Sequence, residues 1–160
     1  DPAMATGLLA MMAPTLGRCQ AGQWQDRRES NLLDGGAPFY RSYSTSEGRA
    51  VAVGAIEPRF YAALLQGLGL DASKLPKQHD RSQWQRMRET FAGIFASQTR
   101  AHWEQVFEGT EACVSPVLSL AELPASPHLS QRGSFVEVDG VLQPAPAPRF
   151  SKTPGAIGGR

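Results

Sequence analysis

The sequence predicts an α+β fold, in which a small antiparallel or mixed sheet of hairpins packs against about three helices and follows one linker helix. Three observations support this prediction. Strand-like runs flank a Gly-containing reversal between residues 39 and 55. Apolar residues then recur at helical spacing in three stretches, and an Asp-Gly pair marks a second hairpin. We expect a helix and connector over residues 1–30, a small α+β domain over 31–143, and a Pro/Gly-rich linker over 144–160.

The composition is that of an ordinary globular chain. It has 160 residues and a net charge of +1. A chain of this length can bury about two thirds of its unfolded surface, which is enough for one core. The charge gives no support for a nucleic-acid or membrane-surface partner, and no apolar run approaches the roughly 20 residues that span a bilayer. Cys19 and Cys113 are isolated, so we expect two buried or inert thiols in a reducing compartment.

The first thirty residues predict one helix and a polar connector. Asp1-Pro2 is a suitable helix start, whereas Pro14 and Gly17 weaken the helix. One side of this helix carries Met4, Leu8, Met11 and Met12. A methionine stripe is usually core, because thioethers fill irregular gaps, and the alternative is an adaptable apolar surface. The connector over residues 20–30 mixes opposite charges, which is typical of a solvated surface.

Residues 31–55 predict a glycine turn and then a β-hairpin. The adjacent glycines of Asp34-Gly35-Gly36 allow positive φ at no steric cost. A first strand is indicated by Phe39, Tyr40 and Tyr43. Ser46-Glu47-Gly48 then reverses the chain into a second strand, Arg49–Ala55. One face of that strand carries Val51 and Val53, and the other is small enough for a backbone or a ligand to approach.

A carboxylate lies where the second strand becomes a helix, in the turn Ile56-Glu57-Pro58. Proline suits the first helical position, since its missing N–H would be unpaired there. The buried stripe of this helix is predicted from Phe60, Tyr61, Leu64, Leu65 and Leu68. Glu57 therefore lies at a helix N-terminus, where the macrodipole favours negative charge. It either caps the helix or orients a hydrogen-bond donor in a site.

Two further helices are predicted to form an αα-hairpin on the sheet. Asp80 and Gln83 resemble a capping box for the first of them, and Thr99 can cap the second. Their buried faces are predicted to comprise Trp84, Met87, Phe91, Ile94, Phe95, Trp103, Val106 and Phe107. The aromatic residues here are therefore interpreted as core.

The last part of the chain predicts short elements. Residues 112–118 form a strand that Pro116 places at an edge or bulge. Ser119 and Glu122 form a small capping box for one helical turn, and residues 124–131 form a surface loop. Asp139-Gly140 joins two strands in a type I′ turn. From Pro144 onward no periodic pattern remains.

No self-sufficient active site is evident in the sequence. His79, His102 and His128 are expected in a loop, a helix and a loop, and none has a second histidine at metal-ligand spacing. Neither a CxxC pair, a GxSxG elbow nor a P-loop occurs. We therefore expect no bound metal, and any chemistry would come from a site to which this chain contributes only a part.

Four stretches carry a family resemblance: LLDGGAPFYRSY, VAVGAIEPRFYAALLQGLGLD, FEGTEACVSPVLSLAEL and RGSF. With them, the chain from residue 1 to about residue 153 resembles the α-methylacyl-CoA racemases, a branch of the family III CoA-transferase superfamily (CaiB/BaiF type). The resemblance implies epimerisation of 2-methyl-branched acyl-CoA thioesters by 1,1-proton transfer through an enolate, with no added cofactor. Transferases of the superfamily tend to have glycines where this chain has Ala55-Ile56-Glu57-Pro58, so the racemase branch fits better.

The resemblance also implies site roles for individual residues. Glu57 matches a small-domain glutamate that lies beside the catalytic histidine of the family. Tyr40 matches an aromatic residue of the same pocket, after the turn that holds Asp34 and Gly35, and Ile56 would wall the acyl pocket. The methionine-rich surface against which the family's acyl chains lie is matched by Met4, Met11 and Met12.

The family's catalytic His and Asp belong to a large domain, and no Gly-His-Asp segment occurs in this chain. We therefore expect a fragment that lacks the large domain and its natural N-terminus and is inactive alone. The resemblance implies a cytoplasmic enzyme and an interlocked homodimer, and the uncovered apolar surface would favour self-association. The alternatives are a family III CoA-transferase, which needs a nucleophilic aspartate, and a non-catalytic binding or assembly domain.

Overall fold

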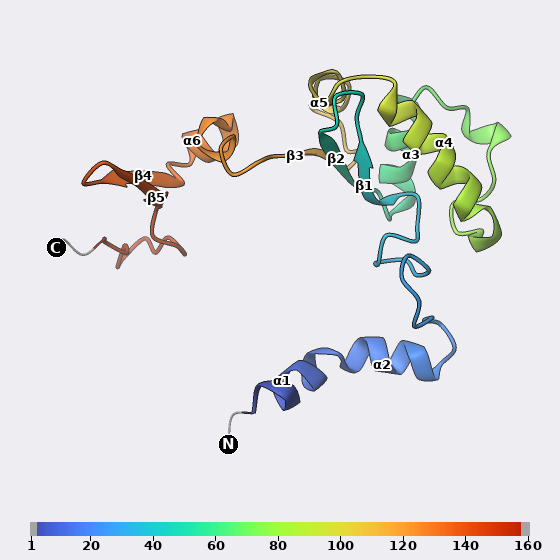
Figure 1. The fold of residues 1–160 in the computed structure, drawn as a ribbon, viewed down its shortest axis with the longest axis horizontal. Coiled ribbons are helices and arrows are strands. Elements are labelled where there is room, and N and C mark those ends of the chain that lie inside the picture. Colours follow the sequence, from blue (N-terminus) through green and yellow to red (C-terminus); the bar gives the residue numbers. More distant parts are fainter. Residues whose placement is uncertain (1–2, 158–160) are drawn as a thin grey trace. The chain divides into compact units, whose positions relative to one another are not determined.

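A computed structural model describes residues 3–157, and the chain forms two compact units, Asp1–Val117 and Leu118–Arg160 (Figure 1). The division falls inside the stretch that the sequence predicts as one small domain, residues 31–143. The domain boundaries expected after residues 30 and 143 stay predictions. The predicted helix start at Asp1-Pro2 lies outside the described residues.

The N-terminal segment contains two helices where the sequence predicts one. Helix α1 spans Met4–Met11 and helix α2 spans Ala13–Gln20. Pro14 lies in the first turn of α2, where its missing N–H costs no hydrogen bond, so it begins a new helix rather than weakening the first. Neither helix has a buried residue. Of the two alternatives for the methionine stripe, a core position does not hold within the described residues, since Met4 is 86% exposed and Met11 is 78% exposed.

A three-stranded antiparallel sheet forms the centre of the first unit. Strand β2 (Ala50–Gly54) lies between β1 (Tyr40–Ser44) and β3 (Val114–Val117). Tyr43 of β1 lies opposite Val51, and Pro116 of the edge strand β3 lies opposite Val51 from the other side. The predicted reversal is confirmed, since the Gly48 N–H donates to the Thr45 carbonyl at 3.0 Å. The edge position predicted from Pro116 is also confirmed, because proline cannot donate to a further strand.

Three helices follow the hairpin, as the sequence predicts. They are α3 (Pro58–Gly67), α4 (Trp84–Ala96) and α5 (Arg100–Phe107), with short 3-10 turns η1 (Ala72–Lys74) and η2 (Arg81–Gln83) between α3 and α4. Thr99 caps α5 through the His102 N–H, which confirms its predicted role. The Asp80–Gln83 capping box is wrong: the Asp80 carboxylate accepts from the Ser82 N–H and hydroxyl and caps η2 instead.

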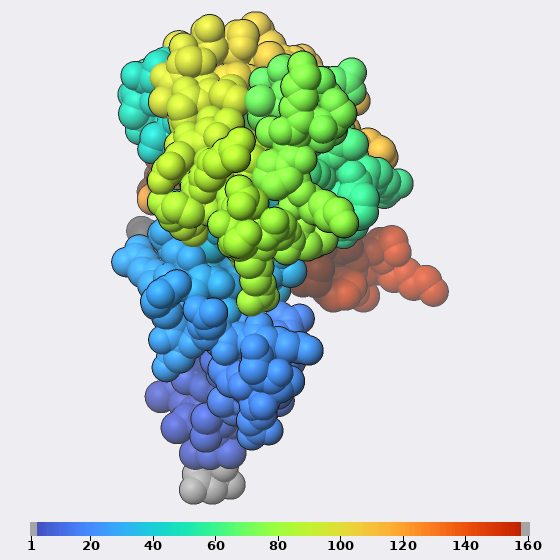
Figure 2. Space-filling model, turned by 90° about the vertical axis from the view of Figure 1, so that its right-hand side faces the viewer, coloured from blue at the N-terminus to red at the C-terminus, as the bar shows by residue number. Residues whose placement is uncertain are grey.

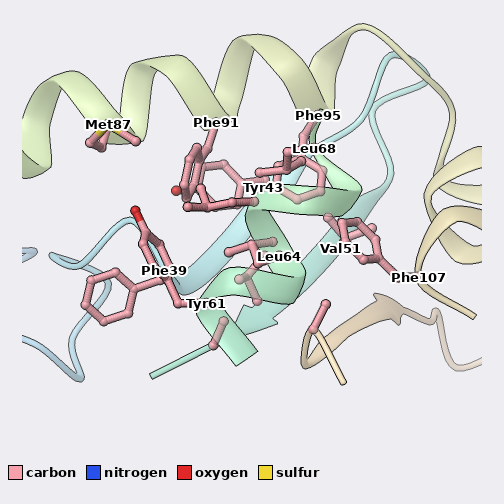
Figure 3. Packing of buried hydrophobic residues seen from close by; sticks show 14 of the residues in the cluster. Phe39, Tyr43, Val51, Tyr61, Leu64, Leu68, Met87, Phe91, Phe95 and Phe107 are labelled. Carbon is pink, nitrogen blue, oxygen red and sulfur yellow. The ribbon is translucent and has the colours of Figure 1, made fainter. Parts of the chain in front are cut away.

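The core lies between the sheet and these helices. Met87, Phe91 and Phe95 point from α4 toward Tyr43 and the α3 leucines (Figure 3). The opposite side of α4, drawn yellow-green in Figure 2, faces solvent, and its exposed residues include Gln85, Arg86 and Glu89. The buried residues that the sequence predicts correctly are those of the helical stripes: Tyr61, Leu64, Leu65, Leu68, Trp84, Met87, Phe91, Phe95, Trp103 and Phe107. Tyr43, Val51 and Val53, which the sequence predicts only as strand residues, are buried with them. Phe60, Ile94 and Val106 are only partly buried.

The second unit consists of short elements. A 3-10 turn η3 (Leu123–Ala125) precedes α6 (Pro127–Gln131), and β4 (Phe135–Val138) pairs with β5 (Val141–Pro144). The Asp139-Gly140 turn has φ of 51° and 76°, which confirms the I′ prediction. The predicted loop over residues 124–131 is wrong because Ser126-Pro127 starts a helix, which also places His128 in α6 rather than in a loop. The Ser119–Glu122 pair is hydrogen-bonded as predicted.

Two expectations concern the whole chain. Cys19 and Cys113 are both free thiols. Of the two alternatives given for them, burial is wrong because both are exposed, and inertness stays a prediction. Among residues 3–157, no helix combines the length and the apolar character that crossing a bilayer requires.

Candidate functional site

Glu57 lies at the junction between β2 and α3. Its backbone is extended, with φ −73° and ψ 145°, and its carbonyl accepts the first helical hydrogen bond from the Tyr61 N–H at 2.9 Å. Pro58 fixes φ at the first helical position and so defines where the helix begins. Glu57 is therefore the N-cap residue, as the sequence predicts.

The side chain of Glu57 does not cap the helix. It is exposed, and among residues 3–157 no hydrogen bond or ion pair to its carboxylate is found. The carboxylate therefore stands free at the positive end of a ten-residue helix, where a negative charge is favoured. This geometry suits a group that accepts a hydrogen bond from a side chain or ligand outside the described residues.

The side chain of Gln78 binds the two residues that precede Glu57. Its side-chain nitrogen Nε2 donates to the carbonyl of Ala55 at 3.1 Å and to the carbonyl of Ile56 at 2.8 Å. The main-chain carbonyl of Gln78 accepts from the indole Nε1 of buried Trp84 at 3.0 Å. Sequence reasoning missed Gln78, because a side chain that reaches back 22 and 23 residues leaves no local signal.

A hollow of about 620 Å³ lies over the open face of the sheet. Its lining residues are Glu29, Gly35, Tyr40, Arg41, Ser42, Ala52, Val53, Gly54, Cys113 and Ser115. Tyr40 lies opposite Gly54 in the β1–β2 register, so the aromatic ring borders backbone without side-chain bulk. The small face that the sequence predicts for β2 is thus the floor of this hollow.

The loop that forms one wall of the hollow is built on Asp34. The Asp34 carboxylate accepts from the N–H groups of Asn31 (2.8 Å), Gly36 (3.0 Å) and Ser30 (3.2 Å) and from the Asn31 amide (2.7 Å). Burial opposes ionisation, but these hydrogen bonds together hold the pKa of Asp34 below its ordinary value. Asp34 thus orders its own loop.

Close backbone packing explains why position 36 of this loop is a glycine. A Cβ added at Gly36 would lie 2.6 Å from the Asn31 carbonyl oxygen and 2.7 Å from the Asn31 nitrogen. Gly35 has φ +88°, a conformation that L side chains rarely adopt. The Asp34-Gly35-Gly36 prediction of a turn is therefore confirmed, and each glycine has its own physical reason.

Two arginines tie this loop to the rest of the unit. Arg41 of β1 donates from Nη1 to the Gly35 carbonyl at 3.0 Å. Arg88 of α4 donates from Nη1 to the carbonyls of Glu29 and Gly36, each at 3.1 Å. Neither arginine is evident from the sequence as a site residue, because each is a single charge on an otherwise ordinary strand or helix.

The structure brings together only some of the predicted site residues. Tyr40 and Gly35 line the same hollow, and Asp34 orders the loop that carries Gly35. Ile56 is partly buried against the core, and its carbonyl is held by Gln78. The remaining predicted site residues do not line the hollow; they are Glu57, Met4, Met11 and Met12. Within residues 3–157, no group of three or more His, Cys, Asp or Glu residues is arranged to hold a metal ion.

Comparisons with known proteins place these features in a family. The family model of CoA-transferase family III matches residues 1–159. The chain is 50% identical to mouse (Mus musculus) alpha-methylacyl-CoA racemase over 135 residues, which is 83% of this chain and 35% of that protein. It is 47% identical to the human (Homo sapiens) alpha-methylacyl-CoA racemase over 132 residues, 82% of this chain and 35% of that protein.

More distant relatives agree with this assignment. A CaiB/baiF CoA-transferase family protein of Caenorhabditis elegans is 34% identical over 118 residues, covering 74% of this chain and 33% of that protein. The crystal structure of Rv3272 from M. tuberculosis superimposes with a TM-score of 0.67 at 12% identity, over 93% of this chain and 40% of that one. This structural likeness supports the fold alone. The chain spans about a third of the length of the curated relatives that it matches.

Proposed function

The chain belongs to CoA-transferase family III, and from this premise we propose that it is part of an alpha-methylacyl-CoA racemase. The observation that carries the proposal is the 50% identity to the mouse racemase over 83% of the chain. The proposed reaction inverts the 2-position of a 2-methyl-branched acyl-CoA. The CoA thioester is the substrate, and we propose that no further cofactor takes part.

Inversion next to a thioester needs a base that removes the α-proton and an acid that returns a proton to the opposite face. We propose that both groups come from outside residues 1–160, since the Gly-His-Asp segment that would supply the catalytic histidine does not occur in this sequence. Glu57 would accept a hydrogen bond from the catalytic histidine, orient its ring and favour its protonated form. The free, exposed carboxylate at the start of α3 supports this role.

The remaining predicted residues would contribute to substrate binding. Tyr40 and Gly35 border the hollow over the sheet, and Ile56 would wall the acyl group. Met4, Met11 and Met12 would offer the acyl chain an adaptable apolar surface, since thioethers accept ligands of either configuration. An interlocked homodimer and a cytoplasmic location remain part of the proposal.

Exchange of the substrate α-proton into deuterated water tests this function. We expect the full-length protein that contains this chain to exchange the α-proton of both (R)- and (S)-2-methylacyl-CoA. The 160-residue chain alone should not do so. We expect Glu57→Gln to slow exchange by the full-length protein about tenfold to a hundredfold, since a charge-assisted hydrogen bond contributes about 1.5–3 kcal/mol. Exchange by the isolated chain would contradict the assignment of the acid and base.

A CoA-transferase is the second candidate, because the family model and the C. elegans relative carry that name. It would move CoA from a thioester to a free carboxylate through an acyl anhydride on an aspartate. CoA transfer by the full-length protein, without α-proton exchange, would favour this activity over the racemase.

A further inference from the structure

The segment between β2 and α3 is short, and the N–H and carbonyl groups of both residues before Glu57 are hydrogen-bonded. The Ala55 N–H donates to the Phe39 carbonyl at 2.9 Å, and the Ile56 N–H donates to the Gly54 carbonyl at 3.1 Å. The carbonyls of Ala55 and Ile56 then accept from one nitrogen, Gln78 Nε2. No other side chain among residues 3–157 is found to bond these two carbonyls.

A glutamine amide is chemically suited to this place. Its NH₂ group carries two donors, and two successive carbonyls of an extended turn offer two acceptors. Removing the donors would leave both carbonyls without a protein partner, which costs free energy because the site is half-buried. The turn would then be free to change the backbone angles that now point Glu57 away from the core.

Gln78 is itself fixed by the core. Its carbonyl accepts from the indole of Trp84, whose ring packs edge-on against Phe39 at a centroid distance of 5.9 Å. The neighbouring His79 packs edge-on against the same Phe39 ring at 5.5 Å. The loop before α4 is thus fixed to the core. Because the Gln78 amide bonds the Ala55 and Ile56 carbonyls, the turn before α3 is fixed to the core as well.

From these contacts we infer that Gln78 is a positioning residue for Glu57: its amide holds the Ala55 and Ile56 carbonyls and so fixes the direction in which the Glu57 carboxylate is presented. The inference rests on the proposed racemase function, in which Glu57 acts on a catalytic histidine. Gln78 need not touch substrate, and its effect passes through Glu57.

A double-mutant cycle in the full-length protein tests this role. Gln78→Met keeps the length of the side chain but removes both donors. We expect it to lower the turnover number for α-proton exchange about tenfold while KM changes by less than about threefold. In the Glu57→Gln background, Gln78→Met should lower turnover by less than about threefold, because the group it positions is already lost. Full additivity of the two effects would overturn the inference.

A matched control and a second readout separate positioning from a general loss of structure. Gln66→Met replaces an exposed glutamine of α3 and should leave turnover unchanged. Amide hydrogen exchange should increase for residues 55–61 in Gln78→Met and not in Gln66→Met. Unchanged exchange in this segment would overturn the inference even if turnover falls. A full-length protein without α-proton exchange would instead overturn the proposed function, so the two failures are distinguishable.

Discussion

Single residues decide how the site segment is shaped, and Asp34 is the clearest example. Its carboxylate accepts four hydrogen bonds within one loop, and three of them come from backbone N–H groups. Asn31, which supplies two, is itself buried and bonds both the N–H and the carbonyl of Gln25. The loop beside the hollow is therefore organised by one charge.

Stability should depend on pH through Asp34. The hydrogen bonds lower its pKa below the ordinary value of 3.8, so the unfolded chain binds this proton more readily than the folded chain. Its contribution to the free energy of unfolding is then complete above the ordinary pKa and is lost as pH falls through the folded value. We expect Asp34→Asn to lower stability by about 1.5–3 kcal/mol near neutral pH, and the difference from wild type to narrow below about pH 5.

Thermal unfolding of the wild-type and Asp34→Asn proteins, from neutral pH to below about pH 5, measures this difference in stability. Asp26→Asn is the control, since Asp26 is exposed and no hydrogen bond to it is found among residues 3–157. A difference between wild type and Asp34→Asn that is the same at every pH would show that the charge of Asp34 does not support the loop.

At the scale of elements, the sequence predicts those features that local chemistry determines. Pro58 sets the start of α3, Thr99 caps α5, and Asp139-Gly140 forms its turn because each acts on its own backbone neighbours. The helix at residues 127–131 has the same kind of signal in Ser126-Pro127, but five residues are too few to show a helical periodicity in the sequence. The break at Met12 is not evident from the sequence, because a proline can either weaken one helix or start the next, and Pro14 starts α2.

Contacts between distant parts of the chain could not be predicted. Gln78 bonds the turn 22 and 23 residues earlier, and Arg88 of α4 bonds the Glu29 and Gly36 carbonyls 59 and 52 residues earlier. Such bonds depend on how the elements pack, and a polar residue that makes them resembles a solvent-facing one in the sequence. The family resemblance therefore identifies Glu57, Tyr40 and Gly35 as candidate site residues. The residues that hold these parts of the chain in place are identified only by the structure.

The packing of α3 against α5 depends on the absence of a side chain. A Cβ added at Gly67 would collide with the ring of Phe107, whose Cζ would lie 2.9 Å away. We expect Gly67→Ala to lower the free energy of unfolding by about 1–3 kcal/mol, although alanine is the better helix former. A Cβ added at Gly93 in α4 has no neighbouring atom within 4 Å. Gly93→Ala should therefore raise the free energy of unfolding by up to about 1 kcal/mol, because alanine is the better helix former.

Urea denaturation measures these changes, and a second substitution tests their cause. Phe107→Leu removes the ring edge that a Cβ at Gly67 would meet, at the cost of lost burial. In combination, Gly67→Ala and Phe107→Leu should cost about 1 kcal/mol less than the sum of the single effects. Strict additivity would mean that the collision does not account for the loss.

For the whole molecule, the two units differ in what they bury. The large apolar core belongs entirely to the first unit, and all its buried members lie between Ala37 and Ala112. The second unit has no fully buried residue among those described and consists of a hairpin, a short helix and an extended segment. The chain spans about a third of its curated relatives, so surfaces exposed here can be covered in a longer protein.

Helix α1 is the strongest case of an uncovered surface. It is apolar on all sides, and a helix of this kind is normally buried. The large apolar side chains exposed on α1, on α2 and at Met12 between them are Met4, Leu8, Leu9, Met11, Met12 and Leu16. We therefore expect the 160-residue chain to self-associate through this surface, because burying one such side chain stabilises a complex by about 1.5–3 kcal/mol.

Sedimentation velocity over a range of concentrations tests this expectation. Leu8→Glu places a charge within the apolar surface and should raise the dissociation constant at least about tenfold, which corresponds to about 1.4 kcal/mol. Leu120→Glu changes an equally apolar and 86% exposed side chain of the second unit and should have no effect. An equal effect of both substitutions would place the contact elsewhere or make it non-specific. An effect of Leu8→Glu alone would assign self-association to the same helices that we propose to contact the acyl chain in the full-length protein.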